Sequence, residues 1–297
     1  VQLRIIYNTA QLYAAIPDYR KAAQKYELWR AQTESPSVSA FVFAGTIYAQ
    51  LKEYDKAISN MKTAIGMAEK PKENWYQLLL AMYYQQKSYR KSADLLQDMI
   101  VLFPEKKVYW EQLAAVYYLI NQDRNALVIT ELAYKRGFVT EEKKLLNLVN
   151  LYLDWGIPLK AATMLETELE KGRVPRNKDN LEKLGRAWIE AKENGPAMKV
   201  LLEAAELGND GELYLTTAQL LADQERWTEA LSAVKRALES GGLRKPGAAY
   251  LFQGSAYYET GQYDKALASF NKSMKHKGSE KQAQRWIAYL SAEENLP

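Results

Sequence analysis

The chain has 297 residues, no cysteine, one histidine and a formal net charge of +4. This composition excludes disulfides, zinc ribbons and iron–sulfur clusters, and the lone His276 cannot form a histidine-based metal site. The net charge is too small to indicate nucleic-acid binding, and no apolar run reaches the roughly 18–20 residues of a membrane-spanning helix.

A ten-residue element recurs along the chain and defines a repeat. Its clearest copy covers residues 257–266, and related copies begin at Tyr48 and Tyr83. In each copy an aromatic residue is followed by Tyr six residues later and by Ala or Ser nine residues later. Extended in chain order, this register predicts eight repeats of about 35 residues. They start near Leu3, Val38, Glu73, Lys107, Glu142, Lys178, Gly211 and Gly247.

Three positions, counted from the start of each repeat, keep their residue type. Position twenty is small in every repeat: Ala22, Ala57, Ser92, Ala126, Ala161, Ala197, Ala230 and Ala266. Position eleven is large: Tyr13, Tyr48, Tyr83, Tyr117, Tyr152, Trp188, Leu221 and Tyr257. Position eight is small in six repeats: Ala10, Gly45, Ala114, Gly185, Ala218 and Gly254. Small residues let two helix axes approach to about 8–10 Å, so each repeat is predicted to be a helix pair, with turns at Gly156, Gly195 and Gly261.

The repeats resemble the tetratricopeptide (TPR) family. The fourth repeat reads Trp110-x2-Leu113-Ala114-x2-Tyr117 and then Ala126, which follows the family pattern. The eighth reads Tyr250-x2-Gln253-Gly254-x2-Tyr257, followed by Ala266-x3-Phe270. The resemblance implies an all-α fold, a right-handed superhelical solenoid of about eight TPR helix pairs over residues 1–297.

The two ends of the chain differ. Residues 280–293 are predicted to form a capping helix over the last repeat, with Ala283, Trp286, Ile287 and Leu290 at helical spacing. At the amino end a helical pattern is already present at Leu3, so we expect an upstream segment to precede this chain. Residues 171–177 and 240–246 are predicted to be loops between repeats.

The sequence contains no recognisable catalytic motif. Gly-x-Gly-x-x-Gly, Gly-x-Ser-x-Gly and Walker-type loops are absent, and Gly241-Gly242 is interpreted as a turn between repeats. His276 lies between two lysines at the end of the eighth repeat, where positive charge complements a helix C-terminus. The basic residues from Lys272 to Arg285 are interpreted as a solvated surface, with an anionic lipid or partner as the alternative. We therefore expect no enzyme activity, metal or cofactor.

The family resemblance implies that positions two, five, nine and twelve of each first helix line a concave groove that binds a protein or peptide. The predicted groove residues are Tyr7, Gln11, Thr46, Gln77, Tyr84, Glu111, Tyr118, Asn150, Arg186, Gln219 and Tyr258. Tyrosine supplies contact area at low entropic cost, although Tyr84, Tyr118 and Tyr258 have the alternative of packing between repeats. Leu146 occupies the position expected for a carboxylate-clamp lysine, which argues against that clamp despite Asn150 and Lys143.

Residues 133–162, with residues 211–214 and 242–247, are similar to proteobacterial TPR proteins that are often encoded beside TonB/ExbB/ExbD energy-transduction genes. That similarity implies a periplasmic accessory of a TonB-dependent transport system, with TonB-system components as partners and a signal peptide outside this chain. The alternative is an adaptor or regulatory subunit that recruits substrates to an envelope protease or assembly enzyme.

Overall fold

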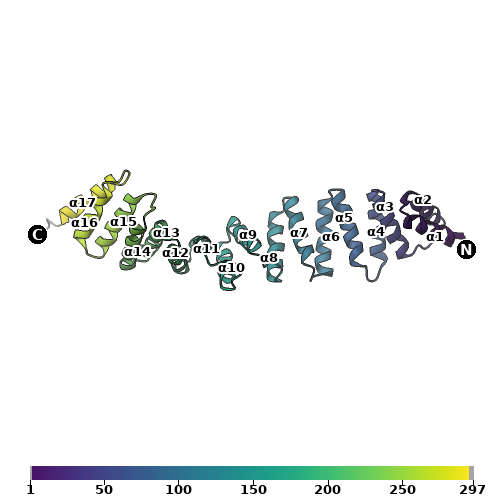
Figure 1. The fold of residues 1–297 in the computed structure, drawn as a ribbon, viewed down its shortest axis with the longest axis horizontal. Helices are drawn as coiled ribbons and strands as arrows, with labels where there is room; N and C mark the ends of the chain where they lie inside the picture. Colours follow the sequence, from purple (N-terminus) through teal and green to yellow (C-terminus); the bar gives the residue numbers. More distant parts are fainter. Residues whose placement is uncertain (1, 294–297) are drawn as a thin grey trace. The chain divides into compact units, whose positions relative to one another are not determined.

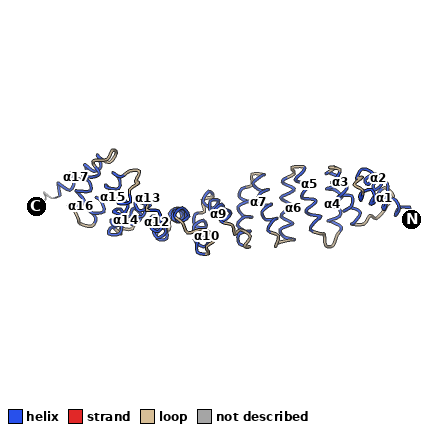
Figure 2. Tube along the Cα trace, in the orientation of Figure 1, coloured by secondary structure: helices blue, strands red, loops and turns tan. Residues whose placement is uncertain are grey.

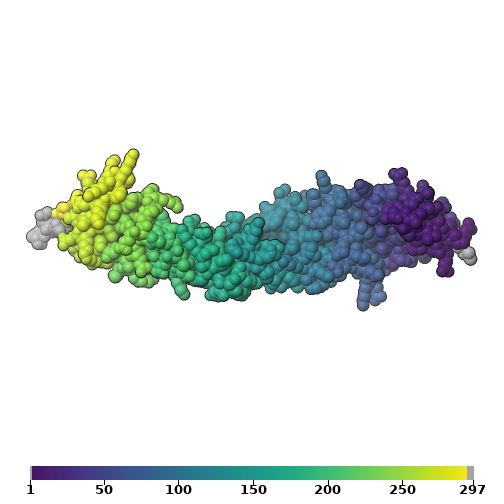
Figure 3. All heavy atoms as spheres, in the orientation of Figure 1, coloured from purple at the N-terminus to yellow at the C-terminus, as the bar shows by residue number. Residues whose placement is uncertain are grey.

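The computed structural model describes residues 2–293, and this part of the chain consists of helices joined by short turns and loops (Figure 1, Figure 2). The chain divides into two compact units, residues 1–139 and residues 140–297. Within each unit every helix packs mainly on its neighbours in sequence, so the colours of the surface follow one another in chain order (Figure 3).

The first unit contains four helix pairs. Its helices are α1 (Gln2–Ala15), α2 (Tyr19–Arg30), α3 (Val38–Gln50), α4 (Tyr54–Met67), α5 (Glu73–Gln85), α6 (Tyr89–Leu102), α7 (Lys107–Leu119) and α8 (Asp123–Lys135). The first helix of a pair is odd-numbered and the second is even-numbered. Each pair is joined by a short turn, and the second helix then packs on the first helix of the next repeat.

The second unit contains four more pairs and a terminal helix. Its helices are α9 (Glu142–Asp154), α10 (Pro158–Glu170), α11 (Lys178–Glu190), α12 (Asn194–Gly208), α13 (Gly211–Ala222), α14 (Trp227–Ser240), α15 (Pro246–Glu259), α16 (Tyr263–Ser273) and α17 (Glu280–Glu293). The predicted all-α fold of eight helix pairs followed by one helix is thus confirmed over the described residues. A single uninterrupted array stays a prediction.

The core follows the repeat positions. All eight side chains at position twenty have no exposed surface. Position eleven is buried in every repeat except the first, where Tyr13 is half-buried. Glycine at position eight permits close contact within a pair: a Cβ on Gly254 would lie 2.4 Å from Cε1 of Phe270, and one on Gly185 would lie 2.4 Å from Cδ2 of Leu201. Small residues therefore set the spacing of the helices, and large ones fill the space between them.

The terminal helix α17 covers the end of the second unit. Its Ala283 and Leu290 are buried, and Trp286 stacks on Phe270 of α16 with ring centroids 5.2 Å apart and an interplanar angle of 9°. These contacts remove the apolar side of the eighth pair from water, which the isolated pair could not do.

The turn inside each helix pair has one recurring conformation. The residue at position fifteen has a positive φ in all eight repeats: Pro17, Lys52, Lys87, Asn121, Gly156, Lys192, Glu225 and Gly261. The prediction was therefore right in placing turns at Gly156 and Gly261 and wrong for Gly195. Gly195 lies in the first turn of α12, and Lys192 takes the left-handed conformation instead.

The loop between α10 and α11 is held by a buried carboxylate. Glu168 is fully buried, and its side chain accepts a hydrogen bond from Nη2 of Arg173 at 2.7 Å. Its backbone carbonyl accepts from the N–H groups of Arg173 and Val174, and Val174 is buried. Arg176 forms two hydrogen bonds to Glu203, of 2.7 and 2.6 Å. Arg173 and Arg176 of this loop therefore pair with acidic side chains of the same chain.

Candidate functional site

The predicted groove residues are spread over eight first helices, α1 to α7 in the first unit and α9 to α15 in the second. In α1 the Tyr7 ring contacts Trp29 of α2 and Phe43 of α3, with centroids 4.5 and 5.7 Å away. Tyr7 is half-buried, and it packs between helices. Gln11 and Thr46 are exposed, and the Thr46 hydroxyl donates to the carbonyl of Val42 in its own helix at 2.9 Å.

Gln77 belongs to a hydrogen-bonded network between α5 and α7. Its amide donates to the hydroxyl of Tyr109 at 2.8 Å, and that hydroxyl donates to the carboxylate of Glu73. The Tyr109 hydroxyl, with a smaller contribution from Lys106, lowers the pKa of Glu73 below its ordinary value. The Gln77 amide therefore links two repeats, although its side chain is exposed.

Among the four groove tyrosines, Tyr118 is the most accessible. Its side chain on α7 is 39% exposed, and burial of the remainder, together with Asp123, raises its pKa. Glu111 lies seven residues earlier on the same helix face and pairs with Lys107 at 3.6 Å. Tyr84 is half-buried and contacts Tyr89 across the turn of its own pair, with ring centroids 6.3 Å apart.

Two groove residues of the second unit have polar partners, Asn150 on the next first helix and Arg186 on its own helix. Asn150 of α9 accepts a hydrogen bond from Nζ of Lys183 in α11 at 2.9 Å. Arg186 is exposed and pairs with Glu182 one turn earlier, and Gln219 of α13 is also exposed.

Tyr258 of α15 lies in an aromatic cluster. Its ring contacts Tyr263 at 5.6 Å, Trp286 at 5.4 Å and Tyr289 at 6.0 Å, measured between centroids. The hydroxyls of Tyr258 and Tyr289 lie 3.3 Å apart. These contacts match the alternative given for Tyr258 in the sequence analysis, in which the ring packs between its own repeat and the next helix.

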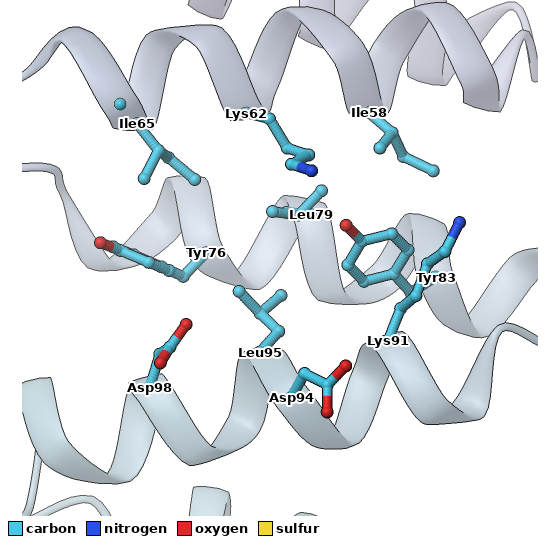
Figure 4. Close-up of a pocket in the computed structure, with 11 residues that line it drawn as sticks. Ile58, Lys62, Ile65, Tyr76, Leu79, Tyr83, Lys91, Asp94, Leu95 and Asp98 are labelled. Carbon is cyan, nitrogen blue, oxygen red and sulfur yellow. The ribbon is translucent and has the colours of Figure 1, made fainter.

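A cleft that the sequence did not indicate lies between the second helices α4 and α6 (Figure 4). This α4–α6 cleft has a volume of about 490 Å³. It is lined by Ile58, Lys62, Ile65 and Gly66 of α4, by Tyr76, Leu79 and Tyr83 of α5, and by Lys91, Asp94, Leu95 and Asp98 of α6. Figure 4 shows α5 as the floor and the other two helices as walls, with Asp94 and Asp98 on the α6 side.

The α4–α6 cleft combines an apolar floor with unpaired charges. Tyr76, Leu79 and Tyr83 are buried, whereas Lys62, Lys91, Asp94 and Asp98 are exposed. Within the described residues none of these four charged groups forms an ion pair. Burial raises the pKa of Tyr76 and of Tyr83, and Asp98 and Asp94 respectively raise them further.

A second cleft lies one repeat earlier, between α2 and α4, and there both Glu27 and Lys56 contact Tyr48. It encloses about 870 Å³ and includes Glu27, Tyr48 and Lys56. The Tyr48 hydroxyl donates to the Glu27 carboxylate, and the Lys56 ammonium lies 5.0 Å from the centroid of the Tyr48 ring. Burial, followed by that hydrogen bond, raises the pKa of Tyr48.

The part of the chain that the structure describes contains no cluster typical of metal binding. No three His, Cys, Asp or Glu side chains there are placed to hold a metal ion. The ring of His276 stacks on Tyr250 with centroids 5.6 Å apart. None of the helices within residues 2–293 is both long and apolar enough to cross a bilayer.

Several solved structures are similar to this chain. A crystal structure of MamA is 22% identical, with a TM-score of 0.43, over 58% of this chain and 97% of that one. The structure of YrrB, described as a TPR protein with an unusual peptide-binding site, is 22% identical, with a TM-score of 0.44, over 65% of this chain and 97% of that one. The N-terminal domain of stress-induced protein-1 from C. elegans is 18% identical, with a TM-score of 0.36, over 38% and 94% of the two chains.

Family comparisons identify the repeats directly. No curated protein sequence matches the chain. Residues 38–71, which span α3 and α4, match a tetratricopeptide repeat model, and residues 215–275, which extend from α13 into the turn after α16, match a second one. One match lies in each compact unit, and both agree with the helix pairs described above. The chain thus carries tetratricopeptide repeats.

Proposed function

We propose that the protein is a non-enzymatic scaffold that binds segments of partner proteins on the exposed face of its first helices. The observation that carries the proposal is the face of α7, where Glu111 and Tyr118 are both exposed and lie two turns apart. Position eleven lies in the core, and the same helix register brings position nine to the surface in the first seven repeats, whereas positions five and twelve are mostly half-buried. An exposed tyrosine beside polar groups is typical of protein interfaces.

The proposal is tested by replacing one exposed side chain in each unit. Tyr118→Ala and Arg186→Glu are introduced separately, and partners are identified in intact cells by crosslinking mass spectrometry. Leu132→Ala is the matched control, because Leu132 on the second helix α8 is 41% exposed and Tyr118 is 39% exposed. We expect crosslinks near Tyr118 to be lost and the affinity of a captured partner to fall about tenfold, a loss typical of an aromatic contact residue. Unchanged partners and affinities in both variants would show that this face does not bind.

A finer proposal concerns the system in which the scaffold acts. The similarity of residues 133–162 to TPR proteins encoded beside TonB-system genes supports a periplasmic accessory of TonB-dependent transport. The same crosslinking experiment tests it, because peptides from TonB, ExbB or an outer-membrane receptor would be recovered. Recovery of an envelope protease or assembly enzyme instead, with activity that changes on mixing, would support the adaptor alternative.

A further inference from the structure

At positions four and eleven, most aromatic rings have a Lys or Arg side chain of the same chain placed over them. At position eleven the pairs are Lys21 over Tyr13, Lys56 over Tyr48, Lys160 over Tyr152 and Lys265 over Tyr257. At position four they are Arg30 over Phe41, Arg136 over Trp110, Arg236 over Tyr214 and Lys272 over Tyr250. The cations lie 4.9–5.8 Å from the ring centroids, within the range of cation–π attraction. The remaining position-eleven tyrosine outside the third repeat, Tyr117, accepts a hydrogen bond from Gln97.

The third repeat departs from this pattern at both positions. In the described part of the chain neither Tyr76 nor Tyr83 carries a cation, and neither hydroxyl forms a hydrogen bond. Lys91 stands where Lys56 stands in the second repeat, yet it is not placed over Tyr83. At position twenty-six the charge is reversed: α6 has Asp98 where the seventh and eighth repeats have cations. The α4–α6 cleft is therefore an aromatic floor with carboxylates beside it and no cation placed over either tyrosine ring.

We propose that the α4–α6 cleft binds a segment of a partner protein that presents one lysine or arginine flanked by apolar residues. The partner's cation lies over Tyr76, which carries no internal cation, and pairs with Asp98 and Asp94. These carboxylates lie one helical turn apart on α6, close enough to share one cation. The flanking apolar side chains cover Leu79 and the half-buried isoleucines of α4.

The arrangement of charge around the cleft also gives the segment a direction. Figure 4 shows Lys62 on the α4 wall, and it shows both carboxylates and Lys91 on the α6 wall, with Lys91 beside Tyr83. A partner cation is repelled by Lys62 and Lys91 and attracted by the aspartates, so it lies on the α6 side at the end of the cleft where Tyr76 and Asp98 face each other. The apolar residues of the segment then lie toward Ile58 and Ile65. This polarity selects a segment with a basic edge and an apolar edge.

This site is separate from the face proposed above. Tyr76 and Tyr83 lie about 100° around α5 from Gln77 and Tyr84, because successive helical residues are rotated by that angle. The inference therefore goes beyond the proposed function, and the two proposals fail independently. Loss of binding in Tyr118→Ala reports on the first-helix face, whereas loss in variants of Asp98 reports on the cleft.

The decisive variant is Asp98→Arg, which gives the third repeat the arrangement that Arg236 and Tyr214 have in the seventh. A phage-displayed library of random short peptides is selected against the whole protein, and the recovered peptides are synthesised with a fluorophore. We expect sequences with one Lys or Arg next to apolar residues, and an affinity at least about tenfold weaker for Asp98→Arg. Asp154→Arg is the control, because it changes the net charge equally at an exposed position in the second unit.

A second variant measures the contact itself. In Asp98→Asn the carboxylate is lost and no cation is introduced, and each peptide is also made with its basic residue replaced by Gln. If the two groups pair, the Gln peptide binds the unchanged protein more weakly, but binds Asp98→Asn about as well as the basic peptide does. Circular dichroism confirms that both variants are helical. The proposal would be overturned if the selected peptides lacked a basic residue. It would also be overturned if the basic peptide bound Asp98→Asn as tightly as the unchanged protein, or if Asp154→Arg lost as much affinity as Asp98→Arg.

Discussion

At the scale of single residues, the glycines at position eight show how closely the helices of one pair approach. Gly254 faces the ring of Phe270, which has no exposed surface and is held by the stacked Trp286. A methyl group added there would lie 2.4 Å from the ring, well inside van der Waals contact. Because neighbours fix the ring on both sides, the strain of a larger residue cannot be relieved by a side-chain rotation alone.

We predict that Gly254→Ala destabilises the second unit by about 1–3 kcal/mol. The matched control is Gly195→Ala, because Gly195 also lies in a helix and a Cβ there has no atom within 4 Å. That control should be neutral or stabilising by up to about 1 kcal/mol, since alanine loses less entropy on folding. Urea midpoints followed by circular dichroism give both values. Equal midpoints for the two variants would contradict the packing argument.

The sequence predicted these packing residues well and the α4–α6 cleft not at all. The small residue at position eight and the large residue at position eleven recur at a fixed spacing, so comparing the repeats is enough to identify both. Asp98 is an exposed aspartate on a helix, and such residues usually face solvent without a partner. The available signal was a comparison across repeats, which places Asp98 where Arg236 and Lys272 stand. The position of the Lys91 ammonium depends on its rotamer and its neighbours, which no sequence pattern specifies.

At the scale of elements, the turn within each pair is a helix C-terminus of one type. The backbone N–H of position sixteen donates to the carbonyl of position eleven in every repeat, at 2.8–3.0 Å, as in Glu193 to Trp188. This six-to-one hydrogen bond belongs to the Schellman motif, which requires a left-handed residue just before the donor. The motif therefore accounts for the positive φ at position fifteen. Glycine occupies that position only at Gly156 and Gly261, so glycine alone was an incomplete guide to the turns.

Substitutions at position fifteen should therefore have opposite signs. In Lys192→Gly the left-handed conformation of φ 64° is no longer penalised by a Cβ, which offsets the larger entropy of glycine in the unfolded chain. We predict a gain of up to about 1 kcal/mol for Lys192→Gly and a loss of about 1–2 kcal/mol for Gly156→Ala. Thermal midpoints of both variants check this. A loss for Lys192→Gly would mean that its side chain contributes more than its backbone conformation costs.

At the scale of the whole molecule, the repeated packing positions allow the fold to be predicted, whereas the exposed positions, which would contact a partner, do not repeat. Packing constrains position twenty in every repeat, position eleven in seven and position eight in most of them, so eight weak copies together predicted the helix pairs. The exposed positions are not constrained in this way, and their residues differ from Gln11 to Tyr118 and Arg186. The helices pack chiefly on sequence neighbours within each unit, so stability is expected to be a sum of local terms.

This local packing predicts how the protein responds to a cavity. Leu96 of α6 has no exposed surface, and Leu96→Ala should remove about 2–5 kcal/mol from the interactions around it. Hydrogen exchange followed by mass spectrometry should become faster in α5, α6 and α7, which pack on one another. Exchange in α13 to α16 should stay unchanged. When stability is local, these helices do not have to unfold when α6 unfolds. Faster exchange throughout both units would instead show that the sixteen paired helices unfold as one cooperative body.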